Sequence, residues 1–117
     1  MGLLFVEVLP REAGPGGSAV LKCRQCRVDA APAAAILSKD FQGRLGRAYL
    51  FDRVVNITLG PKEDRHLMTG LHTVSDIYCN CCQEMLGWRY DKAYEESEKY
   101  KEGKFILEKV RMWKEVR

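Results

Sequence analysis

Segments suited to β-strands recur along the whole chain. Residues 105–110 alternate between two faces and residues 3–9 alternate loosely, which is the period of two expected of a strand. Other segments are rich in β-branched and aromatic residues, which strands favour. The predicted strands are residues 3–9, 19–22, 49–51, 54–59, 66–69, 72–78, 87–90 and 105–110.

Glycine and proline residues separate these segments and set the expected turns. Pro10 and the Gly-rich run 11–17 end the first strand in a turn or mobile loop, and a Gly-Pro pair at 60–61 ends the fourth. Gly70 lies between two segments rich in β-branched and aromatic residues, which predicts a hairpin.

Helical patterns are scarce. Residues 93–100 carry glutamates followed by lysines, and they predict a short helix that stops near Gly103. The mixed charges around it, Lys101 included, are typical of a solvated face. Residues 30–35 predict either a loop or one weak helical turn, because Pro32 opposes a long helix.

The composition fits one compact unit. The chain has 117 residues, of which 46% are hydrophobic, and a chain of this length buries roughly two thirds of its unfolded surface. Because it shows no internal repeat, linker or second composition regime, we expect a single mainly-β domain over residues 1–117. Its core is expected at about residues 19–114.

Two cysteine pairs far apart in the sequence carry the clearest chemistry. Cys23 with Cys26, and Cys79 with Cys82, each have the C-x2-C spacing of a zinc knuckle. Together they supply the four thiolates of one structural Zn²⁺ site, at about 2.3 Å per sulfur. Such a site leaves no position for water, which argues against hydrolysis by zinc. Ligand softness alone would also allow an iron–sulfur cluster or another metal.

Other features of the sequence indicate the cellular compartment of the protein. Five cysteines is an odd number, and no leader sequence opens the chain, which disfavours secretion. The apolar start is far shorter than the ~20 residues that cross a bilayer, and Val6 stands where a myristoylation signal needs Ser or Thr. We therefore expect an intracellular protein without a membrane partner.

Charge along the sequence disfavours a nucleic-acid partner. The 19 basic and 16 acidic residues are interleaved, and they leave a net charge of +3. The sequence pI near 8.6 falls below the value of about 9 that is typical of nucleic-acid-binding domains.

The two cysteine pairs, the Gly-Trp-Arg-Tyr segment at 87–90 and several spaced positions between the pairs resemble the Yippee-like family. The spaced positions are Gly46, Leu50, Asn56 and Gly70. The similarity continues through residues 99–103. The chain departs from the family pattern in its longer run at 11–17 and in Cys81, an extra thiol inside the second pair.

This resemblance implies a zinc-anchored β fold of the β-tent type, with little helix. The same fold type is found in the ligand-binding domain of cereblon, in certain centromere-licensing proteins and in methionine-R-sulfoxide reductases. The resemblance further implies a small protein of the nucleus and cytoplasm, linked to cell growth or division, with no established enzymatic activity.

The relation to cereblon also implies an aromatic pocket lined by Trp88. Plain core packing is the alternative for this residue, although a buried tryptophan usually needs a partner for its N–H group. The hairpin before the second knuckle offers His72 rather than a second tryptophan. The candidate cleft for a small-molecule or peptide ligand, or for a protein partner, is therefore His72, Trp88 and Tyr90.

Three functions are consistent with these residues. The first is a non-enzymatic zinc-binding interaction module for protein partners, which by analogy with cereblon would serve in a ubiquitin-ligase assembly. The second is a thiol-dependent reductase of the methionine sulfoxide reductase type, which needs Cys81 as a thiol of lowered pKa. The third is a zinc-ribbon nucleic-acid binder, which needs an exposed basic stripe with stacking aromatic rings.

Overall fold

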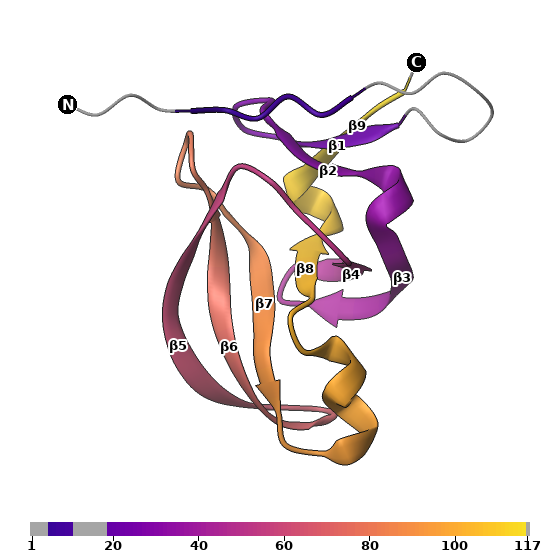
Figure 1. Ribbon diagram of the computed structural model, residues 1–117, viewed down its shortest axis with the longest axis vertical. Coiled ribbons are helices and arrows are strands. Elements are labelled where there is room, and N and C mark those ends of the chain that lie inside the picture. Colours follow the sequence, from indigo (N-terminus) through magenta and orange to yellow (C-terminus); the bar gives the residue numbers. More distant parts are fainter. Residues whose placement is uncertain (1–4, 11–18, 117) are drawn as a thin grey trace.

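Nine β-strands make up most of the described residues, 5–10 and 19–116, of a computed structural model (Figure 1). The strands are β1 (Val20–Cys23), β2 (Asp29–Pro32), β3 (Ile36–Gly43), β4 (Gly46–Phe51), β5 (Ile57–Leu67), β6 (Gly70–Cys79), β7 (Met85–Ala93), β8 (Phe105–Glu108) and β9 (Met112–Glu115). Three 3₁₀-helices connect them, η1 (Ala33–Ala35), η2 (Glu96–Lys101) and η3 (Lys109–Arg111). The mainly-β prediction is confirmed. Within the described residues, no helix has the length and apolar character needed to cross a membrane.

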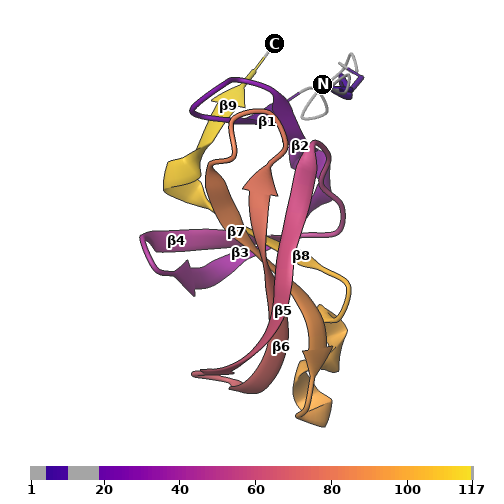
Figure 2. The ribbon, with the colours of Figure 1, turned by 90° about the vertical axis from the view of Figure 1, so that its left-hand side faces the viewer.

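The strands form two antiparallel sheets. The smaller sheet has the order β2-β1-β9, and the larger has the order β3-β4-β8-β7-β6-β5. In Figure 2 the β3–β4 hairpin projects to the side of the long strands β5, β6 and β7, so the larger sheet is strongly bent. The smaller sheet covers one end of the larger one (Figure 1).

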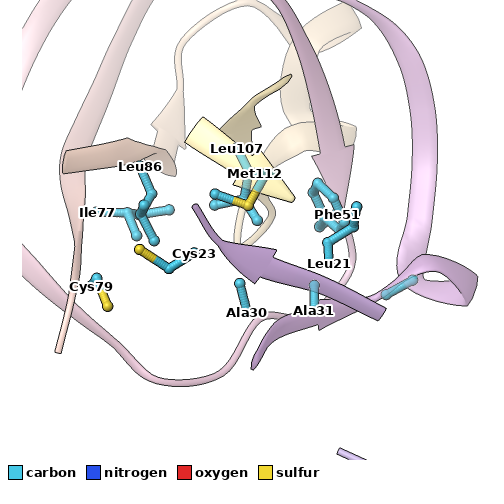
Figure 3. Close-up of a cluster of buried hydrophobic side chains, with 11 residues drawn as sticks. Leu21, Cys23, Ala30, Ala31, Phe51, Ile77, Cys79, Leu86, Leu107 and Met112 are labelled. Carbon is cyan, nitrogen blue, oxygen red and sulfur yellow. The ribbon is translucent and has the colours of Figure 1, made fainter. Parts of the chain in front are cut away.

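Two apolar clusters fill the space between these elements. The first contains Phe51 and Leu107 together with the buried cysteines Cys23 and Cys79 (Figure 3). The second consists of Ala48, Leu50, Val74, Tyr90 and Ile106, with Trp88 packed against it. Neighbouring residues of one strand point to opposite faces, so β4 and β8 each serve both clusters.

Gly87 permits the close approach of β7 to β8. A Cβ atom at this position would lie 1.9 Å from the carbonyl oxygen of Ile106. Any larger residue would therefore push the two strands apart, and with them the neighbouring Trp88. This contact gives a steric reason for glycine within the Gly-Trp-Arg-Tyr segment.

The structure corrects several predicted elements. Residues 5–9 are not in a strand, so that part of the predicted strand 3–9 is wrong, while residues 3–4 lie outside the described residues. The predicted turn at 11–17 also lies outside them. The predicted helix at 93–100 is replaced by the end of β7 and by η2, whereas a helical turn does form at η1.

β5 continues through the Gly-Pro pair that was expected to end it. The pairing of β5 with β6 shifts register between Leu59 and Lys62, so the pair lies in a bulge. β5 is also an edge strand, where the missing N–H of Pro61 is tolerated. For residues 30–32 the prediction of a loop or a weak helical turn is wrong, since they belong to β2. The strands β3 and β9 had no prediction, because their sequences lack the expected alternation or β-branched content.

Candidate metal centre and aromatic cleft

The first cysteine knuckle is a tight loop that leaves β1. The N–H of Cys23 donates to the carbonyl of Val28 at 2.9 Å, and the N–H of Arg27 donates to the carbonyl of Cys23 at 2.8 Å. Arg27 has a left-handed φ of 69°, which turns the chain back immediately after Cys26. The two cysteines are thereby held at the two ends of one backbone bend.

The second knuckle, which leaves β6, repeats this arrangement. The N–H of Cys79 donates to the carbonyl of Glu84 at 2.8 Å, and the N–H of Gln83 donates to the carbonyl of Cys79 at 2.9 Å. Gln83 has a φ of 66° and directly follows Cys82, as Arg27 follows Cys26. The two knuckles therefore present their sulfurs in equivalent ways.

Asn56 connects the second knuckle to β2, the strand that follows the first knuckle. Its φ of 59° is left-handed, a conformation that Asn tolerates better than most residues. Its carbonyl accepts the N–H of Asn80 in the second knuckle at 2.9 Å, and its Nδ2 donates to the carbonyl of Asp29 in β2 at 2.7 Å. The same side chain exchanges hydrogen bonds with the backbone of Glu7, at 2.7 and 2.8 Å.

The four sulfurs meet in one cluster. The Sγ atoms of Cys23, Cys26, Cys79 and Cys82 all lie within 4.8 Å of one another. Across the knuckles, Cys23 is 3.6 Å from Cys82 and Cys26 is 3.5 Å from Cys79. A tetrahedron with zinc–sulfur bonds of about 2.3 Å has edges of about 3.8 Å. The arrangement thus suits one structural zinc ion bound by all four cysteines.

Burial makes the thiolate of Cys23 dependent on a metal. Burial is the main cause that raises the pKa of the Cys23 thiol to about 12. A thiolate in such a place is stable only beside a positive charge, and a bound zinc ion supplies that charge. Because Cys23 ends β1 and Cys79 ends β6, with Cys26 and Cys82 in the loops that follow, a zinc ion bound by all four would also join the smaller sheet to the larger one.

Cys81 lies outside the sulfur cluster. It is exposed, and it is absent from the group of four that could hold a metal. A hydrogen bond with the Cys26 thiol is the main cause that raises the pKa of the Cys81 thiol. A nucleophilic cysteine needs the opposite shift, since the thiolate is the reactive form.

The aromatic cleft lies at the second apolar cluster. It is a cavity of about 690 Å³ whose lining includes Trp88 and Tyr90 of β7, Phe41 of β3 and Lys101 of η2. The rings of Trp88 and Tyr90 meet edge to face, with centroids 6.2 Å apart. Of the three predicted cleft residues, the structure thus brings Trp88 and Tyr90 to one cavity.

His72 is placed behind Tyr90. Its side chain is fully buried, its ring centroid lies 5.2 Å from that of Tyr90, and it is not among the residues that line the cavity. Nδ1 lies 2.9 Å from the carbonyl oxygen of Gly70, while Nε2 has no hydrogen-bond partner among the described residues. His72 supports the ring of Tyr90 from the core side.

Lys101 was missed by the sequence analysis. The mixed charges of residues 95–104 predict a solvated face, yet the Lys101 side chain is only 3% exposed. Its ammonium group forms an ion pair with Glu98 and lies 5.2, 5.3 and 5.8 Å from the ring centroids of Phe41, Tyr90 and Tyr100. Glu98 and Tyr100 are close in sequence, but Phe41 and Tyr90 come from distant strands, so no pattern in the sequence identifies this buried cation.

Comparisons with known proteins agree with this geometry. A family model described as "Yippee zinc-binding/DNA-binding/Mis18, centromere assembly" matches residues 19–114. A yippee-like protein of Oryza sativa subsp. japonica is 80% identical over 119 aligned positions and covers 100% of both chains. A yippee-like protein of Arabidopsis thaliana is 57% identical over 99 positions, covering 85% of this chain and 93% of its own.

A solved structure shows the same fold. The crystal structure of the Mis18 'Yippee-like' domain superposes with a TM-score of 0.67. It covers 85% of this chain and 96% of its own, at 14% sequence identity. At that identity the similarity concerns the arrangement of strands only.

Proposed function

This chain belongs to the Yippee-Mis18 family, and from this premise we propose that it is a non-enzymatic zinc-binding module for interaction with protein partners. Residues 1–117 act as a single domain, with a core at about 19–114. One structural zinc holds the two sheets together, and the aromatic cleft receives a segment of a partner or a small ligand. The observation that carries the proposal is the cavity of about 690 Å³ beside Trp88 and Tyr90.

The cleft has the features of a recognition site. Its volume falls within the roughly 300–1,000 Å³ of known ligand pockets, and its aromatic walls sit among a few fixed polar groups. Arg65 donates to both carboxylate oxygens of Asp76, at 3.0 and 3.1 Å, which holds one polar part of the lining in place. Burial raises the pKa of Tyr90 to about 12, so its hydroxyl remains protonated at physiological pH.

The proposed absence of catalysis has two supports. Four cysteine ligands leave the zinc without an open coordination position for water or substrate. With four of the five cysteines bound to zinc, Cys81 has no second free cysteine in the sequence to act as the resolving thiol of a sulfoxide reductase. Both features favour the interaction module over the reductase.

The proposed cellular setting follows from the resemblance to cereblon and remains part of the proposal. The module would act inside the cell, in the nucleus and cytoplasm, as a subunit or substrate-binding element of a ubiquitin-ligase assembly linked to growth or division. Recovery of ligase components with the zinc-loaded protein from native extract tests this setting. Their consistent absence from specific complexes contradicts it.

The test of the cleft uses Trp88. Affinity purification from native extract compares the zinc-loaded wild type with Trp88→Ala and with Tyr94→Ala. Tyr94 is a matched control because it is an exposed aromatic residue that does not line the cavity. We expect partners to be retained by the control and lost from Trp88→Ala.

A second measurement separates a binding role from a packing role. In a Trp113→Phe background Trp88 is the sole tryptophan, so its fluorescence reports access to the cleft. An open cleft predicts quenching by acrylamide and a small stability cost for Trp88→Phe. A shielded Trp88 whose replacement destabilises the protein while every partner is retained would contradict the proposed role of the cleft.

A further inference from the structure

A second cavity lies between the two sheets, away from the aromatic cleft. It has a volume of about 500 Å³, and Leu21, Ile36 and Met112 give it apolar walls. The rings of Tyr49 and Trp113 also line it. Two of its lining strands, β9 and β3, are edge strands of their sheets, so each has backbone groups on one side that no strand of the described residues pairs with.

Among the described residues, the charged side chains that line this cavity are all basic. They are Arg24, Lys39, Lys109 and Lys114. All four are exposed, and within residues 5–10 and 19–116 none of them has an ion-pair partner. The cavity and these four residues are called the basic groove below. The four residues are spread over the sequence, so the basic surface that they form cannot be recognised from the order of charges along the chain.

We propose that the basic groove binds an acidic segment of a partner protein that carries an apolar side chain. The carboxylates would face the four cations, and the apolar side chain would fill the space against Leu21, Ile36 and Met112. Association is then steered by charge, while the apolar contact supplies affinity. This inference rests on the proposed interaction role, but it uses a surface other than the aromatic cleft.

The aromatic residues of the groove favour a peptide over single-stranded nucleic acid. Nucleic-acid strands bind through bases that stack on free aromatic faces. Here the guanidinium of Arg27 lies 3.9 Å from the ring centroid of Trp113, and the ammonium of Lys39 lies 5.7 Å from that of Tyr49. Each ring therefore already has a cation of the protein over one face. A hollow with apolar walls is better suited to a single side chain.

The test measures binding of a fluorescein-labelled peptide in which a Leu-Phe pair is flanked by Asp and Glu residues. Anisotropy is followed with the full-length, zinc-loaded protein at low and at physiological salt. We expect saturable binding that weakens with salt. Replacing the Leu-Phe pair by Ser-Ser, or the acids by Lys, should weaken it strongly.

Charge reversal locates the site. The double variant Lys39→Glu, Lys114→Glu places two negative charges on opposite sides of the groove and should weaken binding by at least about tenfold. The matched control is Lys62→Glu, Lys92→Glu, which changes two exposed strand lysines outside both cavities. The match is close because Lys92 lies over the ring of Tyr94, as Lys39 lies over that of Tyr49. The control should bind like the wild type.

The remaining outcomes overturn the proposal. It fails if the acidic peptide does not bind, if both double variants lose binding equally, or if oligo(dT) binds the same groove more tightly than the peptide. Trp88→Ala separates this test from that of the cleft. If Trp88→Ala still binds the peptide, the result supports the basic groove as the peptide site even if the cleft has no partner. If only Trp88→Ala loses binding, the peptide binds in the cleft, and the proposal for the basic groove is contradicted.

Discussion

At the zinc end of the protein two separate loops use the same backbone arrangement, whereas at the cleft end no local arrangement recurs. Each knuckle has a left-handed residue, Arg27 or Gln83, directly after its second cysteine, and each closes with the same pair of hydrogen bonds. The cleft instead collects Phe41, Trp88 and Lys101 from three different elements. The zinc end is thus specified locally and completed by a metal, while the cleft end depends on how distant elements pack.

The largest expected effect is at the zinc end. Cys79→Ser removes one buried ligand and leaves three cysteines to hold the ion, one of them the buried Cys23, so we expect loss of zinc and of the folded state. Zinc binding contributes about 10–16 kcal/mol in small zinc modules, which exceeds the stability of most domains. Far-UV circular dichroism and metal analysis measure both losses. A zinc-free Cys79→Ser protein that melts like the wild type would contradict the structural role of the metal.

The second largest loss of stability is expected at Asn56, which connects the second knuckle to β2. Asn56→Ala removes the side-chain hydrogen bonds to Asp29 and Glu7 and places a less tolerant residue at a left-handed φ. We expect a loss of about 2–4 kcal/mol in the free energy of unfolding. Chemical denaturation of the zinc-loaded protein measures it.

Asn56→Gly separates the two contributions at this position. Glycine adopts the left-handed conformation freely, so this variant loses the side-chain hydrogen bonds without the conformational strain. It should therefore be less destabilised than Asn56→Ala. Equal stability of the wild type and both variants would show that the side-chain hydrogen bonds of Asn56 to Asp29 and Glu7 do not stabilise the fold.

The same contrast explains which features of the protein could be predicted from its sequence. The ligands Cys23, Cys26, Cys79 and Cys82 follow from spacing alone, because a C-x2-C turn is a local motif. The strands with many β-branched residues, such as β6, were also predicted from local pattern. The edge strand β3 was not, because its sequence has few β-branched residues and its alternation of exposed and half-buried positions is interrupted by register shifts before Phe41.

The cleft and the basic groove could not be derived from pattern in this way. Lys101 is buried because a ring from β3 and a ring from β7 close around it, and neither contact is visible from its neighbours in sequence. Lys39 and Lys114 meet at the groove although 75 positions separate them in the chain (114 − 39). Charge that is evenly mixed along a sequence can still be gathered by the fold at one surface.

At the cleft end, the ion pair of Lys101 and Glu98 should contribute less than the zinc site. Glu98→Gln leaves the buried ammonium of Lys101 without its carboxylate, and we expect a loss of about 1–3 kcal/mol near neutral pH. Lys101→Met is the companion variant, since it keeps the apolar stem among the rings. Stability curves of both single variants and of the double variant give the coupling energy, and a coupling of zero contradicts a structural role for the pair.

The pH dependence of this pair has a defined sign. The hydrogen bond from Lys101 lowers the pKa of the Glu98 carboxyl below its usual value. The stabilisation is therefore present above the unfolded pKa of about 4.3 and is lost as the pH falls through the lower, folded pKa. The difference in stability between the wild type and Glu98→Gln should shrink over that range. Loss of zinc in acid affects both proteins alike, so it does not mimic this change.

The smallest effect is expected within the zinc end itself, at the cysteine that the fold leaves out. Cys81→Ser changes an exposed side chain outside the sulfur cluster, so zinc content should be unchanged and stability should differ by at most about 0.5 kcal/mol. In the zinc-loaded wild type, a maleimide should label Cys81 before the four ligands, because its side chain is exposed and lies outside the sulfur cluster. Mass spectrometry of the labelled protein identifies the site.

If Cys81→Ser instead lost zinc as Cys79→Ser does, the assignment of ligands would be wrong. Rapid labelling of Cys81 at neutral pH would indicate an activated thiol and restore the reductase as a candidate.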